Sequence, residues 1–230
     1  MPSPSPSPVA LILGAGANVG QNVGRAFLAK GYRIALASRS LREEDSSPSQ
    51  VHIRGDFTDP ASVAEIFAKV QSQLEAPSVV IYNAAAATPQ DAKNPLGLPL
   101  KDFSRDFAVN TASAFVAAQQ AVLAFEQLPE SASRTFIFTG NCTNVAPIVA
   151  LMGSGAGKSA TAHIIQCAAE AYKDKGYKFY YADERKADGS PVYSAVDGPA
   201  HASFYTELAE GKSQGPWQQT FVKGFGYKRL

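Results

Sequence analysis

The sequence contains few of the residues that build disulfide-rich or metal-binding proteins. Two cysteines, two methionines, one tryptophan and three histidines occur among 230 residues. Cys142 and Cys167 have neither the spacing of a metal site nor that of a disulfide framework. We therefore expect no metal site and a reducing compartment. The first residues alternate proline and serine and lack the basic and apolar regions of a signal peptide, which predicts a cytoplasmic protein.

The chain also lacks an excess of charge of either sign. Its 21 basic and 20 acidic residues give a formal net charge of +1, which does not favour a nucleic acid or an anionic membrane as partner. No apolar run approaches the ~20 residues that span a membrane. With 45% hydrophobic residues, the chain can bury one sizeable core. We predict a disordered, extended Pro/Ser lead-in over residues 1–8 and one domain over 9–230.

What the chain does contain is a glycine-rich turn after an uncharged apolar stretch. Pro8–Leu13 predicts a strand, Gly14–Gly20 a tight turn and Gln21–Lys30 a helix with apolar residues at helical spacing. Gly14 allows the turn, and Gly20 lets the helix pack closely on the strand. A strand, a glycine turn and a helix present a helix N-terminus to a phosphate.

Further strands and helices alternate along the chain. The sequence predicts strands over 33–38, 51–55, 78–82, 134–139, 177–181 and 219–223, helices over 59–74, 100–127, 154–175 and 202–210, and loops over 41–50 and 87–100. This alternation predicts an α/β fold with three layers, a doubly wound parallel sheet of the Rossmann type. Ligands of such sheets bind at the carboxyl ends of the strands. Four of these ends carry glycine or polar residues, namely Gly14–Gly20, Ser38-Arg39, Asp56 and Asn83, and we expect them to line one crevice.

These strand ends resemble the short-chain dehydrogenase/reductase family over about residues 8–183. The first turn of that family reads Thr-Gly-x-x-x-Gly-x-Gly, and here Asn18 replaces the middle glycine; asparagine tolerates left-handed backbone angles. Asp56 matches the acid that contacts adenine, and Asn110 matches a helix asparagine that holds a water near the catalytic lysine. The resemblance implies cofactor contacts from Gly14, Ala17, Asn18, Val19, Gly20, Ser38, Arg39, Asp56, Phe57, Asn83, Ala84 and Lys158.

The end of the second strand bears on which nicotinamide cofactor is used. NAD enzymes place a carboxylate there to bind the ribose, whereas an arginine accommodates a 2′-phosphate. Ser38 and Arg39 offer a hydroxyl and a guanidinium and no acid. The sequence therefore favours NADP(H), with a solvated surface arginine as the alternative interpretation of Arg39.

The sequence departs from the family at the catalytic residues. The family uses a serine and then Tyr-x-x-x-Lys. Alignment on Lys158 puts Ser154 in place of the tyrosine and Asn141 in place of the serine, and no tyrosine lies between Tyr82 and Tyr172. A lysine can tune a phenol of pKa about 10, whereas a serine hydroxyl is a much weaker acid. The candidate catalytic residues are Lys158, Ser154, Asn141 and Asn110. Other possible donors, each with an ordinary structural interpretation, are Asp183, Glu184, Tyr193, His201 and Tyr205.

The resemblance leaves two functions open. The first is the NADPH-dependent reduction of a small carbonyl or enone compound beneath a covering segment over 184–218. The second is binding of NADP(H) without its consumption, as a sensor or as a non-redox isomerase, lyase or cyclase. Family members pair through the helices predicted here over 100–127 and 154–175, which implies a homodimer or homotetramer.

A minor alternative is a P-loop nucleotide-binding protein. Gly153–Ser159 resembles Gly-x-x-x-x-Gly-Lys-Ser/Thr, although Met152 occupies the first glycine position. This interpretation requires a strand before the turn, for which Val145–Leu151 is the candidate.

Overall fold

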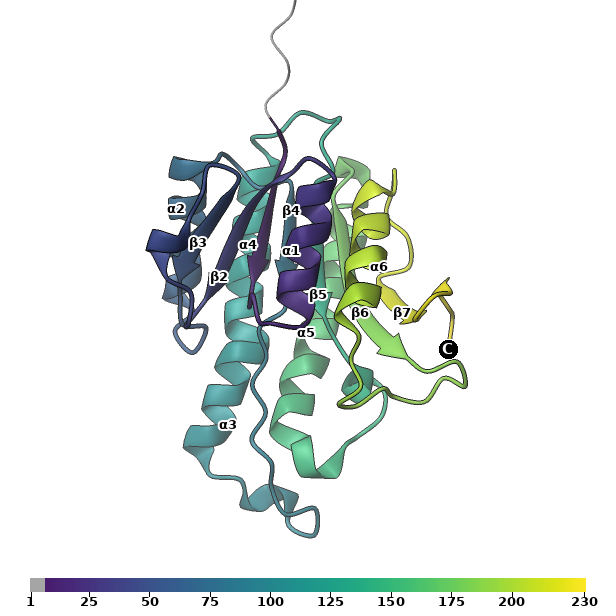
Figure 1. Ribbon diagram of the computed structural model, residues 1–230. Helices are drawn as coiled ribbons and strands as arrows, with labels where there is room; N and C mark the ends of the chain where they lie inside the picture. The colour runs from purple at the N-terminus through teal and green to yellow at the C-terminus, as the bar shows by residue number, and fades with distance from the viewer. Residues whose placement is uncertain (1–6) are drawn as a thin grey trace, which may run out of the picture.

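An eight-stranded sheet lies between two layers of helices in the computed structural model, which describes residues 7–230 (Figure 1). The strands are β1 (Val9–Leu13), β2 (Arg33–Ser38), β3 (Gln50–Arg54), β4 (Val79–Tyr82), β5 (Thr135–Thr139), β6 (Lys178–Arg185), β7 (Gln218–Val222) and β8 (Gly226–Tyr227). Their order is β3-β2-β1-β4-β5-β6-β7-β8. The first seven are parallel to their neighbours, and β8 is antiparallel to β7. The predicted doubly wound Rossmann-type fold is confirmed.

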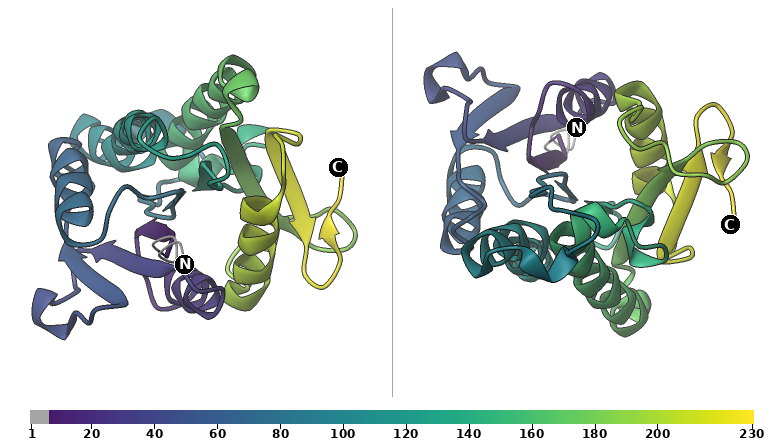
Figure 2. Two further views of the ribbon diagram at one scale, coloured as in Figure 1. Left: turned by 90° about the horizontal axis from the view of Figure 1, so that it is seen from above. Right: turned by 90° about the horizontal axis from the view of Figure 1, so that it is seen from below.

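Helices cover both faces of the sheet (Figure 2). On one face lie α1 (Val19–Ala29) and α6 (Gly198–Glu210), and on the other lie α2 (Ala61–Gln73), α4 (Ser113–Phe125) and α5 (Met152–Ala171). Each face has its own apolar core. The strands β1 and β4 are buried along their whole length, as expected for central parallel strands with helices on both sides.

The long helix predicted over 100–127 has three parts. It consists of α3 (Leu100–Phe107), a π-helical segment (Ala108–Ala112) and α4, which ends at Phe125. α3 and the first turns of α5 extend past the sheet at the carboxyl ends of the strands (Figure 1). A π-helical turn often marks a functional site, and this one contains Asn110.

The prediction that no apolar segment approaches the length needed to cross a membrane is wrong for Leu100–Phe125. Its 26 residues are long and apolar enough to cross a bilayer by length and composition. Half of its most apolar window is buried inside the protein, as in the core helix of a soluble protein, so the finding is weak evidence for a membrane.

One further prediction is wrong, and one strand is missing from the predictions, near the end of the chain. The sequence predicts that the sixth strand ends at Tyr181, but β6 runs to Arg185, so Asp183 and Glu184 lie within the strand. The reason is that β7 pairs with this extension, with Asp183 opposite Thr220 and Glu184 opposite Phe221. The two-residue strand β8 was not predicted.

The P-loop interpretation is wrong. Residues 153–159 form the first turns of α5, and only a 3₁₀ turn (Val149–Leu151) precedes them where a strand is required. The glycines serve helix packing: a Cβ on Gly157 would lie 2.9 Å from the Asn110 Cβ, and one on Gly153 would lie 2.8 Å from Leu98 Cδ2.

Candidate cofactor and active site

The glycine turn after β1 is packed against the end of β4. Gly14 has a φ of +92°, and a Cβ there would lie 2.3 Å from the backbone nitrogen of Ala84. The Asn83 side chain donates a hydrogen bond of 2.8 Å to the Gly14 carbonyl oxygen. A Cβ on Gly20 would lie 2.5 Å from the Cα of Ala15. Both glycines are therefore required by the close approach of backbone segments.

A cavity of about 680 Å³ opens at the carboxyl ends of β1, β2, β3 and β4, and we call it the β1–β4 cavity. It contains six residues of the predicted cofactor set besides Gly14: Ser38, Arg39, Asp56, Phe57, Asn83 and Ala84. Sequence reasoning missed several others, including Gly16, Thr58, Ala85, Ala87 and Arg105. Four strand ends thus form one crevice, as expected.

Charged groups gather at the β2 and β3 side of this cavity. The backbone N–H of Thr58 donates to Asp56 Oδ1 at 3.0 Å. This bond, with a smaller contribution from the charge of Arg39, holds the pKa of Asp56 below its usual range. Asp56 is therefore an anion at neutral pH, and Arg39 provides a cation close to it.

Asn18 has a role that its position in the turn does not predict. Its Nδ2 donates to the carbonyl oxygen of Val196 at 2.8 Å, and its Oδ1 accepts from the N–H of Gly198 at 3.0 Å. A Cβ on Gly198 would lie 2.4 Å from Asn18 Oδ1. The side chain therefore joins the glycine turn to the segment before α6. Ala17, Val19 and Gly20 lie beside it at the start of α1, where Val19 and Gly20 are buried.

A second cavity of about 350 Å³ lies at the carboxyl ends of β5 and β6, and we call it the β5–β6 cavity. Three predicted catalytic residues line it: Asn141, Ser154 and Lys158. Other lining residues with polar side chains are Thr139, Asp183, Glu184, Tyr193, Ser194 and His201. The loop after β6 contributes Pro191, Val192 and Val196. Ala85 and Ala87 line both cavities, so the two adjoin.

Lys158 is buried at the base of the β5–β6 cavity. Its side chain is 5% exposed, its Nζ donates to the Thr139 carbonyl oxygen at 2.9 Å, and it lies 5.0 Å from the centre of the Phe138 ring. Burial lowers the pKa of Lys158 to about 8, and the nearby charge of Asp183 opposes this effect. Thr139 is bonded a second time through its side chain, because the Tyr205 hydroxyl donates to Thr139 Oγ1 at 2.9 Å.

Asn141 is held rigidly at the end of β5. Its Oδ1 accepts hydrogen bonds from the backbone N–H and the hydroxyl of Thr143, at 3.0 and 2.6 Å. Its backbone N–H donates to the Tyr181 hydroxyl, which donates to the Asn141 carbonyl oxygen. The turn therefore uses Oδ1 of Asn141, whose side chain lines the cavity. Ser154 is 5% exposed on the first turn of α5.

Asn110 acts on the site through the segment that follows β4. Its Oδ1 accepts from the N–H of Ala86 at 3.2 Å, and its Nδ2 donates to the Ala86 carbonyl oxygen at 2.6 Å. Its own carbonyl oxygen accepts a bond of 2.6 Å from the Thr161 hydroxyl on α5. Asn110 thus positions the segment beside the β1–β4 cavity.

The end of β6 places ionisable groups beside the β5–β6 cavity. Arg185 Nε donates to Asp183 Oδ2 at 2.6 Å, and Arg185 Nη1 donates to the Gly189 carbonyl oxygen at 3.1 Å. Glu184 Oε2 accepts from the Asp197 N–H at 2.8 Å and lies 3.5 Å from His201 Nδ1. Burial lowers the pKa of His201, so its ring is neutral at pH 7.

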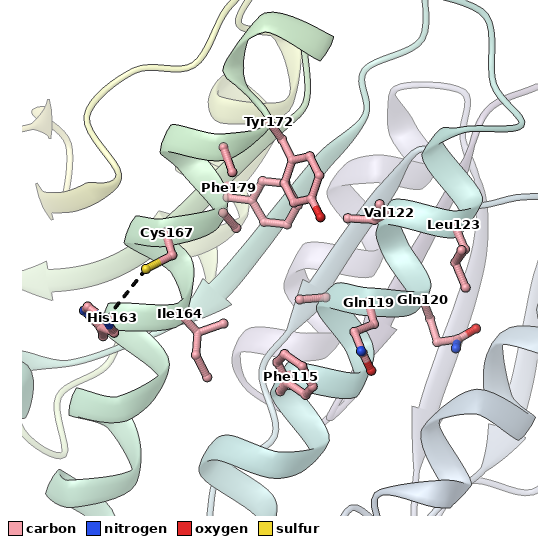
Figure 3. Close-up of a pocket in the computed structure, with 13 residues that line it drawn as sticks. Phe115, Gln119, Gln120, Val122, Leu123, His163, Ile164, Cys167, Tyr172 and Phe179 are labelled. Carbon is pink, nitrogen blue, oxygen red and sulfur yellow. Dashed lines mark hydrogen bonds between the residues drawn. The ribbon is translucent and has the colours of Figure 1, made fainter.

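A third cavity of about 660 Å³ lies between the outer faces of α4 and α5 (Figure 3). Apolar side chains dominate it, among them Phe115, Val122, Leu123, Ile164 and Tyr172. His163 Nε2 lies 3.7 Å from the sulfur of Cys167 on its rim. None of its lining residues lines the other two cavities, so it is a separate feature.

The sequence and the fold match a known class of proteins. The family described as short chain dehydrogenase matches residues 8–180 of this chain. The chain belongs to the short-chain dehydrogenase/reductase family.

Individual relatives agree with this assignment. The chain is 48% identical to the short chain dehydrogenase/reductase dmxR12 of Cryptosporiopsis sp. (strain 8999), over 95% of this chain and 93% of that protein. It is 29% identical to a 3-beta-hydroxysteroid dehydrogenase of Comamonas testosteroni, over 74% of this chain and 66% of the relative.

Solved structures share the fold at low identity. A metagenomic short-chain oxidoreductase in complex with NADP has a TM-score of 0.79 at 15% identity, covering 97% of this chain and 100% of its own. The structure of BdcA in complex with NADPH has a TM-score of 0.74 at 17% identity, covering 98% and 97%. A 3-ketoacyl-(acyl-carrier-protein) reductase from Brucella melitensis complexed with NADH has a TM-score of 0.78 at 14% identity, covering 95% and 98%.

Proposed function

We propose that this protein is an NADPH-dependent reductase of a small carbonyl or enone compound. The observation that carries the proposal is the adjoining pair of cavities, with Arg39 on the wall of one and Lys158 on the wall of the other. In a dinucleotide bound along this crevice, Arg39 would hold the phosphorylated adenosine and Lys158 would hold the nicotinamide ribose. Membership in the short-chain dehydrogenase/reductase family supports the same placement.

The residues present fit such a cofactor. Gly16 lines the β1–β4 cavity, and a Cβ there would meet no atom within 4 Å, so the backbone leaves room for a diphosphate. Ser38 and Arg39 suit a 2′-phosphate, Asp56 suits the adenine amine, and Lys158 suits the hydroxyls of the nicotinamide ribose. The reduced cofactor supplies a hydride to the substrate. Among the similar solved structures, some are complexes with NADP or NADPH and one is a complex with NADH. We therefore base the choice of NADPH on Arg39.

The chain's own residues would bind and orient the substrate in the β5–β6 cavity. Ile148, Leu151 and Val192 give it apolar walls, and Asn141, Ser154 and Lys158 give it a polar base. A carbonyl oxygen that accepts hydrogen bonds from this base is polarised, because preorganised donors in a water-poor site stabilise developing negative charge.

The test is the absorbance of reduced nicotinamide in the presence of the purified protein and a panel of ketones, aldehydes and enones. We expect oxidation of NADPH with at least one compound and a slower reaction with NADH. Binding of neither NADPH nor NADH to the protein would contradict the proposal.

A second function remains open because Ser154 occupies the position of the family's catalytic tyrosine. In this alternative the protein binds NADP(H) without consuming it and acts as a sensor or as a non-redox isomerase, lyase or cyclase. Tight binding of NADPH without its oxidation by any compound of the panel would favour this alternative.

We also propose that the protein is a cytoplasmic homodimer or homotetramer that associates through α4 and α5. The support is the apolar surface between these helices, where Phe115 is 44% and Leu123 is 52% exposed (Figure 3). Light scattering after gel filtration should give two or four times the mass of 24.3 kDa. Leu123→Lys should then reduce the mass to that of a monomer, whereas a monomeric wild type would contradict this proposal.

A further inference from the structure

We propose that Asp183 is the acid of this site and delivers the proton that the family takes from its tyrosine. The inference rests on the proposed reductase function, because it names the group that protonates the substrate oxygen. Its starting point is the extension of β6 to Arg185, which places Asp183 in the wall of the cavity instead of in a solvated loop.

Asp183 shares the β5–β6 cavity with the other candidate catalytic residues. It is 1% exposed, and it lines the cavity together with Asn141, Ser154 and Lys158. A substrate oxygen held by the polar base of this cavity would therefore share the cavity with a carboxyl group. Neither the serine at position 154 nor the amide of Asn141 is an acid that can fill this role near neutral pH.

The hydrogen bonds of Asp183 leave one of its oxygens available. Within the described residues, Arg185 contacts Asp183 only through Oδ2. Its Nε donates to Oδ2 at 2.6 Å, and its Nη2 lies 2.6 Å from the same oxygen. Arg185 also donates to the Gly189 carbonyl oxygen. The guanidinium therefore fixes the carboxyl group through Oδ2, and Oδ1 can carry the proton and reach a ligand.

Charged groups on several elements surround Asp183. Burial raises the pKa of the Asp183 carboxyl to about 6, and the cations of Arg185 on β6 and Lys158 on α5 oppose this rise. Glu184 is the next residue of the strand, Cys142 lies after β5, and Tyr205 lies on α6. The negative charge of Asp183 contributes to raising the pKa of Cys142 and that of Tyr205. A carboxyl group in such surroundings is protonated in a useful fraction of molecules in mildly acidic solution.

Three other ionisable side chains, Tyr193, Tyr205 and His201, are placed less well for this role. Tyr193 lines the same cavity but is 63% exposed at its mouth. The Tyr205 hydroxyl is bonded to Thr139 and its pKa is raised by burial. His201 Nδ1 faces the Asp197 carbonyl oxygen at 2.9 Å, and its ring is neutral.

The O–H bond at Asp183 Oδ1 breaks and a new O–H bond forms at the substrate carbonyl oxygen, while the carbonyl carbon receives the hydride supplied by reduced nicotinamide. The carbonyl compound is reduced to an alcohol and the nicotinamide is oxidised. Asp183 is left as a carboxylate beside Lys158 and Arg185, and it regains a proton from solvent.

The first test compares Asp183→Asn with wild type. The amide oxygen of asparagine can still accept the bond from Arg185, so we expect the variant to fold and to bind NADPH with an affinity within about threefold of wild type. We expect kcat to fall by about 100-fold or more, since general acids contribute 10²–10⁴ in rate. Asp188→Asn, which changes an exposed carboxylate in the loop after β6, should leave kcat unchanged.

The second test is the pH dependence. Because the donor must be protonated, kcat/KM of wild type should fall as pH rises through about 6. Arg185→Gln removes a cation that lowers the pKa of Asp183, so the fall should move to higher pH. An NMR pH titration of wild-type protein labelled with ¹³C-aspartate should show one carboxyl group that titrates near pH 6. The signal is assigned by its absence from Asp183→Asn, and the measurement does not require turnover.

The outcomes separate the two levels of the inference. If wild type oxidises NADPH and Asp183→Asn retains the wild-type kcat, the proposed role of Asp183 is wrong and the reductase function stands. Loss of activity in Tyr193→Phe would then identify Tyr193 as the proton donor. If the Asp183 carboxyl titrates near pH 4, the role is wrong whatever the turnover. If wild type oxidises no NADPH, the reductase function fails and this role fails with it.

Discussion

The two adjoining cavities of this protein are built in different ways. The β1–β4 cavity owes its shape to backbone segments that approach closely, as at Gly14 and Ala84, with charged groups at one side. The β5–β6 cavity owes its character to buried ionisable side chains, among them Lys158 and Asp183. The first follows the pattern expected of the family, while the second departs from it at Ser154. The comparison agrees with our proposal that the first cavity binds a dinucleotide and that the chemistry of the second differs from that of the family.

The largest effect should follow the loss of Lys158 from the second cavity. We expect Lys158→Met to reduce kcat/KM by about 100-fold or more, because the ammonium group stabilises developing negative charge in a buried site. The measurement is steady-state NADPH oxidation with the best compound of the panel.

Lys178 provides a matched control for Lys158. It is also buried, and burial lowers its pKa to about 8 as well, but its Nζ donates to the carbonyl oxygens of Leu208 and Ala209 at the end of α6. Lys178→Met should therefore keep its turnover per folded molecule. Equal losses in the two variants would mean that burial of a lysine, and not its place in the cavity, explains the effect.

The next largest effect should separate the two nicotinamide cofactors at the first cavity. Arg39→Ala should weaken NADPH binding by about 10- to 100-fold, the value of a charge-assisted bond of about 1.5–3 kcal/mol. NADH affinity should change little, because NADH lacks the 2′-phosphate. Fluorescence titration of both cofactors measures this, and an equal change for both would assign Arg39 a purely structural role.

Glycine substitutions distinguish the shape of the turn from its use as a binding site. Gly14→Ala should lower the free energy of unfolding by about 1–3 kcal/mol, because the added methyl group collides with Ala84 and the positive φ disfavours alanine. Gly16→Ala meets open space, so it should leave that free energy unchanged while weakening NADPH binding. Urea unfolding and cofactor titration of both variants give the answer; an unchanged affinity in Gly16→Ala would argue against a diphosphate beside Gly16.

The smallest effect concerns the connection between the two regions. Asn18→Ala removes two hydrogen bonds to the segment before α6, so unfolding should become easier by about 1–2 kcal/mol. The loop that contains Val196 should also become more accessible to proteases. Arg25→Ala, on the outer surface of α1, is the control and should change neither property.

The sequence predicted the strand ends that form the first cavity, and it named several polar residues of the second, including Lys158 and Asp183, without the strand extension that places Asp183 there. Runs of apolar residues that end in glycine or polar residues identify the strands and their carboxyl ends, which is why Ser38, Arg39, Asp56 and Asn83 were grouped correctly. Local pattern did not predict the extension of β6, because Asp183, Glu184 and Arg185 look like loop residues until β7 pairs with them.

Contacts between distant parts of the chain also escaped prediction. The bond from Asn18 to Val196 joins residues 178 positions apart, and no periodicity indicates it. The π-helical turn at Asn110 lies inside an alanine-rich stretch whose sequence resembles an ordinary helix. Such features arise from tertiary packing, which overrides local preference.

The most direct test of the central claim is calorimetric titration of the wild-type protein with NADPH and with NADH. We predict saturable binding of both, with a dissociation constant for NADPH at least about tenfold lower, as expected for one charge-assisted contact. Failure of the protein to bind either cofactor would contradict the assignment of the two adjoining cavities as a dinucleotide site.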